Sequence, residues 1–274
     1  MLKKADLYII AAGTGSRMGG TVPKALVHIT DKPCLTSTLQ QAHEKFSRIF
    51  IVTNVLAAAA WTQYFKSLLE DYPEICDRVA TIAISSGLGD GHATLSALKA
   101  TRSARDLRGR AVQATPAAEV VVAWGDVFFQ HAEIFDELLS TPMPGVGVVP
   151  AVMESSPYVA LVTDQDGRCT SAEFSKYGEH REQGWHDQSI FRFKRAALES
   201  ALEQLQAALW KGQRFIGHGN ELSMLYVFHY LYNQGQRIDV YATEWPTLSF
   251  NTPLEVAGIQ TAIDDRWIRR NRVK

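Results

Sequence analysis

The residues with the clearest chemical meaning form one glycine-rich loop near the start of the chain. Residues 11–24 read A-A-G-T-G-S-R-M-G-G-T-V-P-K and follow the apolar run 7–10, which has the character of a buried strand. Glycines where a strand becomes a loop let the backbone approach an anion and turn its N–H groups toward it. Arg17 and Lys24 add two cations of different geometry. This pattern indicates a loop that holds a triphosphate and its developing charge.

Spacing excludes two better-known glycine loops. A dinucleotide-binding fingerprint requires a third glycine three residues after Gly15, where this chain has Met18. A Walker A loop requires G-K-[ST] five residues after Gly13, and that sequence is absent. The loop therefore belongs to a different kind of phosphate site.

A second glycine-rich segment follows the β-rich run 79–84. Gly87, Gly89 and Gly91 lie in the sequence G-L-G-D-G-H-A and indicate a backbone that passes close to a ligand. His92 comes next, and it is equally well explained as a residue at the start of a helix with no ligand role.

Two side chains with oxygen atoms complete the set of candidate functional residues. Asp126 follows the β-rich run 119–123, and a carboxylate at the carboxyl end of a central strand is placed to bind a metal ion, although such a residue also serves as a helix cap. Asn251 precedes Thr252 and Pro253, where it can equally be the N-cap of a helix.

Taken in order, these segments resemble the sugar-1-phosphate nucleotidyltransferases, whose signature is usually A-A-G-x-G-x-R-[LM]-x(n)-P-K-x-[LM]. Leu26 completes that signature here, and the resemblance runs from residue 7 to about residue 262. It implies a GT-A-like, Rossmann-like α/β fold: three α/β/α layers, a mostly parallel mixed central sheet and a small β-hairpin acceptor subregion. The implied reaction is in-line attack by an acceptor phosphate on the α-phosphorus of a nucleoside triphosphate, releasing pyrophosphate.

The resemblance also assigns roles to residues of this chain. Mg²⁺ is the implied cofactor, with Asp126 and Asn251 as its protein ligands. UTP is the favoured donor, because Gly91-His92-Ala93 is closest to what uridylyltransferases carry. The implied catalytic residues are Arg17, Lys24 and Asp126; the nucleotide-binding residues are Ala11, Ala12, Gly13, Thr14, Gly15, Ser16, Gly87, Gly89, Gly91 and His92; the acceptor-binding residues are Tyr158, Glu173, Lys176 and Asp187.

The acceptor half departs from the family pattern. Asp187-Gln188-Ser189-Ile190 stands where sugar-handling members have N-[AT]-G-[IV], and Tyr158-Val159-Ala160 stands where uridylyltransferases have Y-G-R. The alternative is therefore a CTP-dependent cytidylyltransferase for phosphocholine or a polyol phosphate, in which Asp187 and nearby aromatic rings surround a cationic head. Those rings are otherwise the core of a hairpin. A more distant alternative, a non-catalytic nucleotide-binding regulatory module, is disfavoured because Lys24 and Asp126 are present.

The elements that position these residues alternate along the first half of the chain. β-Rich runs at 7–10, 48–53, 79–84 and 119–123 are separated by helical patterns, such as the stripe of Trp61, Tyr64, Phe65, Leu68 and Leu69. Such alternation predicts βαβ units whose ligand lies beyond the carboxyl ends of parallel strands. The second half predicts a hairpin from 158 to 174 with a turn at 164–167, strands at 189–193 and 237–241, and helices at 195–210, at 221–233 and from about 253.

Bulk properties limit the partners. The 28 basic and 29 acidic residues leave a net charge of -1, which argues against nucleic acid and membrane surfaces as partners. Three separated cysteines and the lack of a signal-peptide pattern favour a cytoplasmic location. We expect one nucleotidyltransferase domain over 1–274, with a mainly NTP-binding half at 1–150, a mainly acceptor-binding half at 151–250 and a metal-ligand segment with a helix at 251–274. The partners expected are a nucleoside triphosphate and a phosphorylated small molecule, and the oligomeric state is left open.

Overall fold

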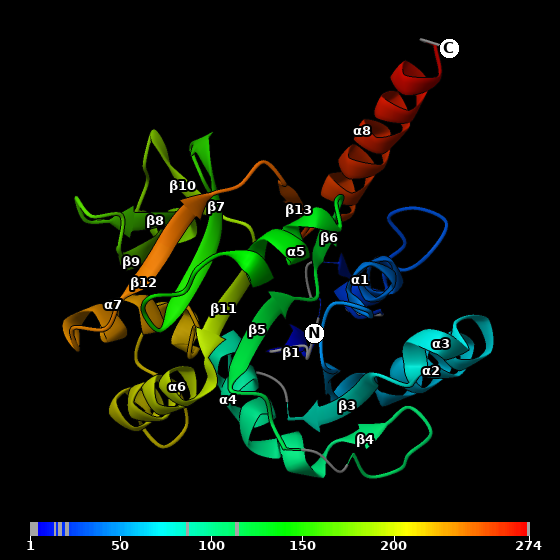
Figure 1. The fold of residues 1–274 in the computed structure, drawn as a ribbon, viewed down its shortest axis with the longest axis horizontal. Coiled ribbons are helices and arrows are strands. Elements are labelled where there is room, and N and C mark those ends of the chain that lie inside the picture. The colour runs from blue at the N-terminus through cyan, green and yellow to red at the C-terminus, as the bar shows by residue number, and fades with distance from the viewer. Residues whose placement is uncertain are drawn as a thin grey trace.

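The computed structural model describes residues 5–13, 15, 18–19, 22–85, 88–112 and 115–272. In this part of the chain the strands form one large mixed sheet in the order β4-β3-β2-β1-β5-β11-β7-β10-β8-β9, and β12 also pairs with β7 (Figure 1). A separate two-stranded sheet joins β6 and β13. The strands are β1 (Ala5–Ile10), β2 (Ile49–Asn54), β3 (Val79–Ile84), β4 (Arg105–Asp106), β5 (Glu119–Trp124), β6 (Val127–Phe129), β7 (Gly147–Ser155), β8 (Val159–Thr163), β9 (Cys169–Phe174), β10 (Gln183–Asp187), β11 (Ile190–Lys194), β12 (Ile238–Ala242) and β13 (Thr247–Ser249).

The four strands predicted in the first half form the parallel centre of the sheet. β1 pairs in parallel with β2 and β5, and β2 pairs in parallel with β3. Their sequences are nearly continuous apolar runs, as expected for strands that are covered on both faces. Their carboxyl ends meet at one edge, where the glycine-rich loop and Asp126 follow.

Helices cover both faces of this sheet, which confirms the predicted three-layer α/β fold. On one face, side chains of α1, α2 and α5 share a hydrophobic cluster with Leu7 and Ile9 of β1. On the other face, side chains of α4, α6 and α7 share a second cluster with Tyr8 of the same strand. The helices are α1 (Cys34–Ala42), α2 (Ala58–Asp71), α3 (Pro73–Cys76), α4 (Asp90–Ala100), α5 (Glu133–Ser140), α6 (Arg195–Leu209), α7 (Tyr226–Asn233) and α8 (Pro253–Arg272).

The second half of the chain adds the antiparallel strands, which lie on the left of Figure 1. β8 and β9 form the predicted hairpin, and its turn is held by Asp164, whose Oδ1 accepts hydrogen bonds from the N–H groups of Asp166 and Arg168. Gly167 completes the turn with φ of 74°. β11 lies antiparallel to β5 and connects this half to the parallel strands.

The helix predicted at 221–233 is shorter in the structure, since α7 begins at Tyr226. The residues before it bond to the loop ahead of α4 instead. The N–H of Leu222 donates to Leu88 O at 3.0 Å, and the N–H of Gly91 donates to Leu222 O at 2.8 Å. These bonds bring residues 221–224 against the segment predicted to bind the nucleotide.

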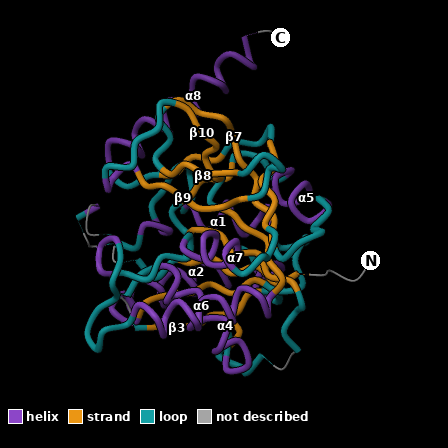
Figure 2. The backbone as a smooth tube through the Cα atoms, turned by 90° about the vertical axis from the view of Figure 1, so that its left-hand side faces the viewer, coloured by secondary structure: helices purple, strands orange, loops and turns teal. Residues whose placement is uncertain are grey.

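The last helix, α8, projects from the body of the molecule in both views (Figures 1 and 2). Its first turns are anchored by Val256 and Ile259, which pack with Phe128 and Phe250. None of the helices in the described ranges combines the length and apolar character that crossing a bilayer requires.

Candidate active site

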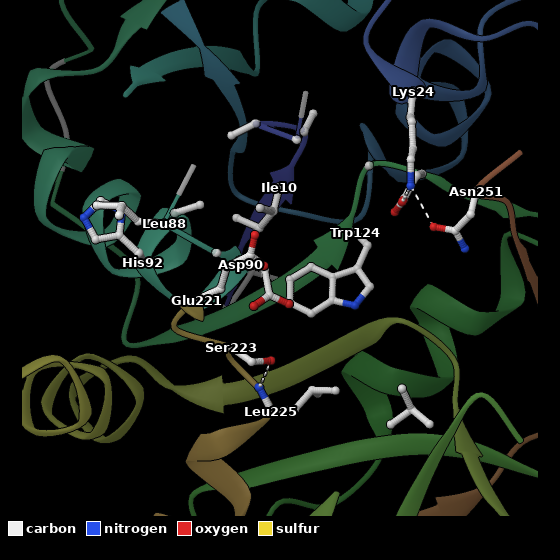
Figure 3. A pocket seen from close by; sticks show the side chains of 18 of the residues that line it. Ile10, Lys24, Leu88, Asp90, His92, Trp124, Glu221, Ser223, Leu225 and Asn251 are labelled. Atoms are coloured by element: carbon white, nitrogen blue, oxygen red, sulfur yellow. Dashed lines mark hydrogen bonds and ion pairs between the residues drawn. The ribbon is translucent and has the colours of Figure 1, made fainter. Parts of the chain in front are cut away.

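A cavity of about 380 Å³ opens at the carboxyl ends of β1, β3 and β5. Its walls come from the glycine-rich loop, the loop before α4, the end of β5, the β8–β9 hairpin, residues 221–226 and Asn251. Figure 3 shows Lys24 and Asn251 at one end of this cavity and His92 at the other, with Trp124 and Asp90 between them. A crevice at this edge of a parallel sheet is where α/β proteins place their ligands.

Lys24, Asp126 and Asn251 meet at one end of the cavity. Lys24 Nζ donates to Asp126 Oδ2 at 2.8 Å and to Asn251 Oδ1 at 2.8 Å, although these partners are 102 and 227 residues away in the chain. The side chains of Lys24 and Asp126 are 17% and 33% exposed, so the group is accessible from the cavity. Three residues selected from separate sequence motifs thus form one hydrogen-bonded cluster.

The β6–β13 ribbon holds Asp126 and Asn251 together. Ser249 of β13 pairs with Val127 of β6, and the N–H of Phe250 donates to Asp126 O at 3.3 Å. Asp126 directly precedes β6, and Asn251 comes two residues after β13. The backbone therefore sets the separation of these two side chains.

Thr252, and not Asn251, caps α8. Thr252 Oγ1 accepts a hydrogen bond from the N–H of Glu255 at 3.3 Å, and Glu255 Oε2 accepts one from the N–H of Thr252 at 3.0 Å. This reciprocal pattern is a capping box. The side chain of Asn251 bonds with Lys24 instead, so the expectation that Asn251 is the N-cap is wrong.

Gly125 allows Asp126 to lie beside the glycine-rich loop. Its N–H donates to Ile10 O at 2.9 Å. A Cβ at this position would lie 2.9 Å from the Cβ of Ala11 and 3.1 Å from its Cα, which is closer than packed atoms come. A side chain here would push the strand ends apart.

Asn54, which the motif analysis did not select, holds the glycine-rich loop. Its Nδ2 donates to the carbonyls of Ala12 at 3.0 Å and Gly13 at 3.3 Å. Because the N–H that follows a carbonyl points the opposite way in a trans peptide, the N–H of Gly13 faces away from Asn54. Asn54 is 3% exposed, and its position at the end of a predicted strand is the signal that would have found it.

The other predicted residues of the glycine-rich loop differ in which backbone groups they leave available to a ligand. Ala11 and Ala12 line the cavity, but the N–H of Ala11 is bonded to Val52 O at 2.9 Å within the sheet. Gly15 has φ of 64°, a conformation that glycine adopts without strain. Thr14, Ser16 and Arg17 lie outside the described residues.

Gly89 and Gly91, at the start of α4, both approach the backbone of residues 221–224 closely. A Cβ on Gly89 would lie 2.5 Å from Leu222 O, and one on Gly91 would lie 2.8 Å from Met224 N. Gly89 also lines the cavity, whereas Gly91 does not and donates its N–H to Leu222. Gly87 lies outside the described residues.

Asp90, another residue that the motif analysis did not select, joins the two segments at this wall. Its Oδ1 accepts hydrogen bonds from the N–H groups of Gly91 at 2.8 Å and Met224 at 2.9 Å. Burial raises the pKa of its carboxyl to about 6, and the negative charge of Glu221 acts in the same direction. A carboxyl with a raised pKa in a cavity is a candidate functional group.

His92 lines the end of the cavity that is farther from Lys24 in Figure 3. Burial lowers its pKa, so the neutral imidazole is favoured at neutral pH. Its ring lies 6.3 Å from the ring of Phe215. A neutral, partly buried ring suits contact with a nucleobase better than contact with phosphate.

Two of the predicted acceptor residues, Tyr158 and Lys176, line the cavity. Tyr158 is 42% exposed, and Lys176 Nζ lies 4.7 Å from the centre of the Tyr177 ring. Burial opposes the charged form of Lys176, but the hydrogen bond that its ammonium donates to the Tyr177 hydroxyl and nearby negative groups, including Asp90, raise its pKa. Further aromatic lining comes from Trp124, Phe174, Tyr177 and Tyr226.

The structure places the other two predicted acceptor residues away from the cavity. Glu173 pairs with Arg181, with Nη2 to Oε1 at 2.8 Å, and this hydrogen bond lowers the pKa of Glu173. Asp187 is buried and 4% exposed, and its Oδ1 accepts a hydrogen bond from the N–H of Ser189 at 2.8 Å. Each carboxylate is used by its own local contact, so neither faces the space where an acceptor fits.

Ser189 has a backbone conformation that glycine favours, at the position where the family pattern has glycine. Its φ is 57°, in the left-handed region that glycine favours. The bond from its N–H to Asp187 supports this turn, and its carbonyl accepts a hydrogen bond from the N–H of Trp124 at 3.1 Å. Asp187 thus supports the cavity wall through Trp124.

The cluster around Lys24 fits a hard divalent cation. Asp126 and Asn251 direct one oxygen each at a single positively charged atom, and oxygen is the donor that Mg²⁺ prefers. No set of three or more histidine, cysteine or acidic side chains suited to a metal ion occurs in the described ranges. Two protein ligands are sufficient for Mg²⁺, which usually takes the others from water and substrate phosphates.

The parallel sheet, the glycine-rich loop at its edge and the hydrogen-bonded cluster of Lys24, Asp126 and Asn251 define an α/β nucleotidyltransferase fold. Residues 7–216 match the family described as the MobA-like NTP transferase domain, so the chain belongs to this family. The bifunctional protein GlmU of Stenotrophomonas maltophilia strain K279a is 26% identical over 168 residues, which cover 61% of this chain and 32% of that protein. The chain thus spans about a third of the length of the GlmU proteins it matches, at 32% and 33%.

Other relatives share a shorter segment or the fold alone. The 2-C-methyl-D-erythritol 4-phosphate cytidylyltransferase of Shewanella amazonensis is 40% identical over 62 residues, 22% of this chain and 24% of that protein. HddC from Yersinia pseudotuberculosis superposes with a TM-score of 0.66 at 18% identity, covering 94% of this chain and 99% of HddC. HddC has also been solved in complex with GMP-PN, with a TM-score of 0.63 at 17% identity, covering 94% of this chain.

Proposed function

We propose that this protein is a nucleotidyltransferase that joins a nucleoside triphosphate to a sugar-1-phosphate or a similar phosphorylated acceptor. A phosphate oxygen of the acceptor forms a bond to the α-phosphorus while the bond to the bridging oxygen breaks, so that pyrophosphate leaves. The observation that carries this proposal is the meeting of Lys24, Asp126 and Asn251 beside the glycine-rich loop. Family membership over residues 7–216 supports it.

The chain's own residues account for the catalysis by positioning and charge. The attacking phosphate is already anionic at neutral pH, so no side chain has to remove a proton from it. The Lys24 ammonium offsets the charge that builds up on the transferred phosphate, and the N–H of Gly13 donates to a phosphate oxygen. Arg17, also assigned to phosphate from the sequence pattern, would add a second cation.

Asp126 and Asn251 are the residues that would hold Mg²⁺, as the sequence resemblance implies. When bound, the ion neutralises phosphate charge and orients the triphosphate. The β6–β13 ribbon keeps the two oxygen ligands in place before any substrate arrives.

UTP is the first donor to test, since Gly91-His92-Ala93 is closest to the uridylyltransferase pattern. His92 lines the end of the cavity farther from Lys24, where we place the base, and Gly89 lines the same cavity. The relatives argue for testing all four triphosphates, because a cytidylyltransferase and an HddC complex with GMP-PN are both among them.

One observation favours a second candidate acceptor, a phosphorylated alcohol with a cationic head such as phosphocholine. Tyr158, Phe174 and Tyr177 line the cavity together with Trp124. The faces of such rings attract quaternary ammonium groups. Asp187, the carboxylate expected to face the cationic head, is buried away from the cavity. The carboxylates that line the cavity are Asp90 and Glu221.

A pyrophosphate-release assay tests the proposal. Hexose-1-phosphates, polyol phosphates and phosphocholine are offered with each of the four triphosphates in the presence of Mg²⁺. We expect turnover with at least one pair, and a loss on the order of a hundredfold in Asp126→Ala and in Lys24→Ala. Asp77→Ala is the matched control, because Asp77 forms an exposed ion pair with Arg108 outside the cavity. Tight triphosphate binding without pyrophosphate release for any acceptor would instead indicate a regulatory nucleotide-binding module.

A further inference from the structure

Lys24 occupies the position between the two residues assigned to the metal. Its ammonium donates to Asp126 Oδ2 and Asn251 Oδ1 at the same distance of 2.8 Å. Both oxygens are therefore already directed at a positive charge. A divalent cation held by Asp126 and Asn251 would use the same carboxylate and the same amide oxygen, which places the lysine and the metal in competition.

Asp126 and Asn251 present their oxygens on short side chains next to a paired backbone, whereas Lys24 reaches them with a long side chain. Asp126 and Asn251 are fixed by the β6–β13 pairing and by the capping box that follows Asn251. Lys24 reaches them through a flexible four-carbon stem from the 3-10 turn at Lys24–Leu26. When the two cations compete, the lysine is the partner that moves.

Electrostatic repulsion disfavours simultaneous contact of both cations with Asp126 and Asn251. A divalent ion bound to Asp126 and Asn251 would repel an ammonium in hydrogen-bond contact with the same atoms. The glycine-rich loop beside Lys24 provides the alternative site, because phosphate groups bound there attract the displaced ammonium. A triphosphate would thus draw Lys24 away from the oxygens that the metal requires.

We propose that Lys24 is a built-in counter-ion that takes the place of the divalent metal in the unliganded protein and exchanges onto the phosphates when metal and triphosphate bind together. This inference rests on the proposed function for the identity of the ligands. It predicts weak binding of the metal alone and positive coupling between metal and triphosphate, which is reciprocal by linkage. The exchange also discourages metal-only occupation of an enzyme without substrate.

Titration with Mn²⁺ alone, followed by electron paramagnetic resonance of the free ion, tests the exchange in the full chain. Lys24→Met and Lys24→Gln are expected to bind Mn²⁺ about three- to tenfold more tightly than the unmodified protein, because the competing charge is gone. Lys99→Met is the matched control, since Lys99 pairs with Glu203 on the surface between α4 and α6. Adding Asp126→Asn to either Lys24 variant is expected to remove the gain.

A second titration in the presence of a non-hydrolysable triphosphate measures the coupling. The triphosphate is expected to raise Mn²⁺ affinity more in the unmodified protein than in Lys24→Met, in which nothing has to be displaced. Equal or weaker Mn²⁺ binding in both folded Lys24 variants would overturn the exchange even if the protein turns over substrate. Tighter binding in those variants without turnover for any acceptor would retain the exchange and refute the proposed function.

Discussion

Glu255 accepts a hydrogen bond from the backbone N–H of Asn251, four residues before it in the chain. The same carboxylate oxygen accepts from the N–H of Thr252 at 3.0 Å. The cap of α8 therefore also fixes the backbone of a residue assigned to the metal. This links the stability of a terminal helix to the geometry of the candidate active site.

Replacing Glu255 with alanine is expected to raise the Mg²⁺ requirement of the reaction while lowering the stability of the fold only slightly. Loss of a helix cap costs about 1 kcal/mol, and Glu255 is exposed, so the protein should remain folded. Because Asn251 loses its backbone anchor, the Mg²⁺ concentration needed for half-maximal turnover should rise several-fold. Glu255→Gln keeps an oxygen acceptor and should restore most of the response. An unchanged Mg²⁺ requirement in Glu255→Ala would show that the cap of α8 does not support the geometry of the candidate active site.

Gly125→Ala tests the close approach between the end of β5 and the glycine-rich loop. The new Cβ would lie 2.9 Å from Ala11 Cβ and 3.1 Å from Ile10 O, so the strands must shift. Overpacking of this kind typically costs about 1–3 kcal/mol in the free energy of unfolding, measured in urea. Turnover should fall at least tenfold because Asp126 moves with the strand end. Gly258→Ala, which meets open space in α8, should be neutral or slightly stabilising.

Asn54→Ala should loosen the glycine-rich loop. The side chain donates to the carbonyls of Ala12 and Gly13 and accepts from the N–H of Ala57 at 2.8 Å. Losing these buried bonds should destabilise the protein by about 2–3 kcal/mol. The KM for the triphosphate should rise more than kcat falls, since the loop binds phosphate before the reaction. Asn54→Asp restores the acceptor but not the donor, and a normal KM in that variant would contradict this role.

The carboxyl of Asp90 should make stability depend on pH. Its folded pKa of about 6 lies above the ordinary 3.8, so the folded protein binds this proton more tightly than the unfolded chain. The resulting stability is fully present below pH 4 and is lost as the pH rises through 6. Asp90→Asn keeps an oxygen for the N–H groups of Gly91 and Met224 and should flatten this part of the profile.

Urea unfolding of both proteins between pH 4 and pH 7 measures the difference attributable to Asp90. Asp77→Asn serves as the control, because Asp77 is exposed and pairs with Arg108. Parallel profiles for the unmodified protein and Asp90→Asn would show that Asp90 titrates normally. The acceptor survey in Asp90→Asn then shows whether this carboxylate also selects the substrate.

The sequence predicted the parallel strands closely because each is a buried apolar run bounded by polar residues. The predicted range 79–84 coincides with β3, and the hairpin turn at 164–167 is supported by Asp164 and Gly167. The helix predicted at 221–233 was too long by five residues, because Leu222 forms backbone bonds with Leu88 and Gly91. Contacts between residues more than a hundred positions apart in the chain leave no pattern in the local sequence.

The sequence alone selected candidate residues for a phosphate and metal site, since Lys24, Asp126 and Asn251 each lie in a motif with residue types suited to that chemistry. Tertiary structure decided which of the candidates meet. It brought those three together, directed Glu173 to Arg181 and buried Asp187 in a hydrogen bond with the N–H of Ser189. It also introduced Asn54 and Asp90, whose importance comes from partners distant in the chain. The physical reason is that residue chemistry is local, whereas the direction of a side chain depends on how separate strands pack.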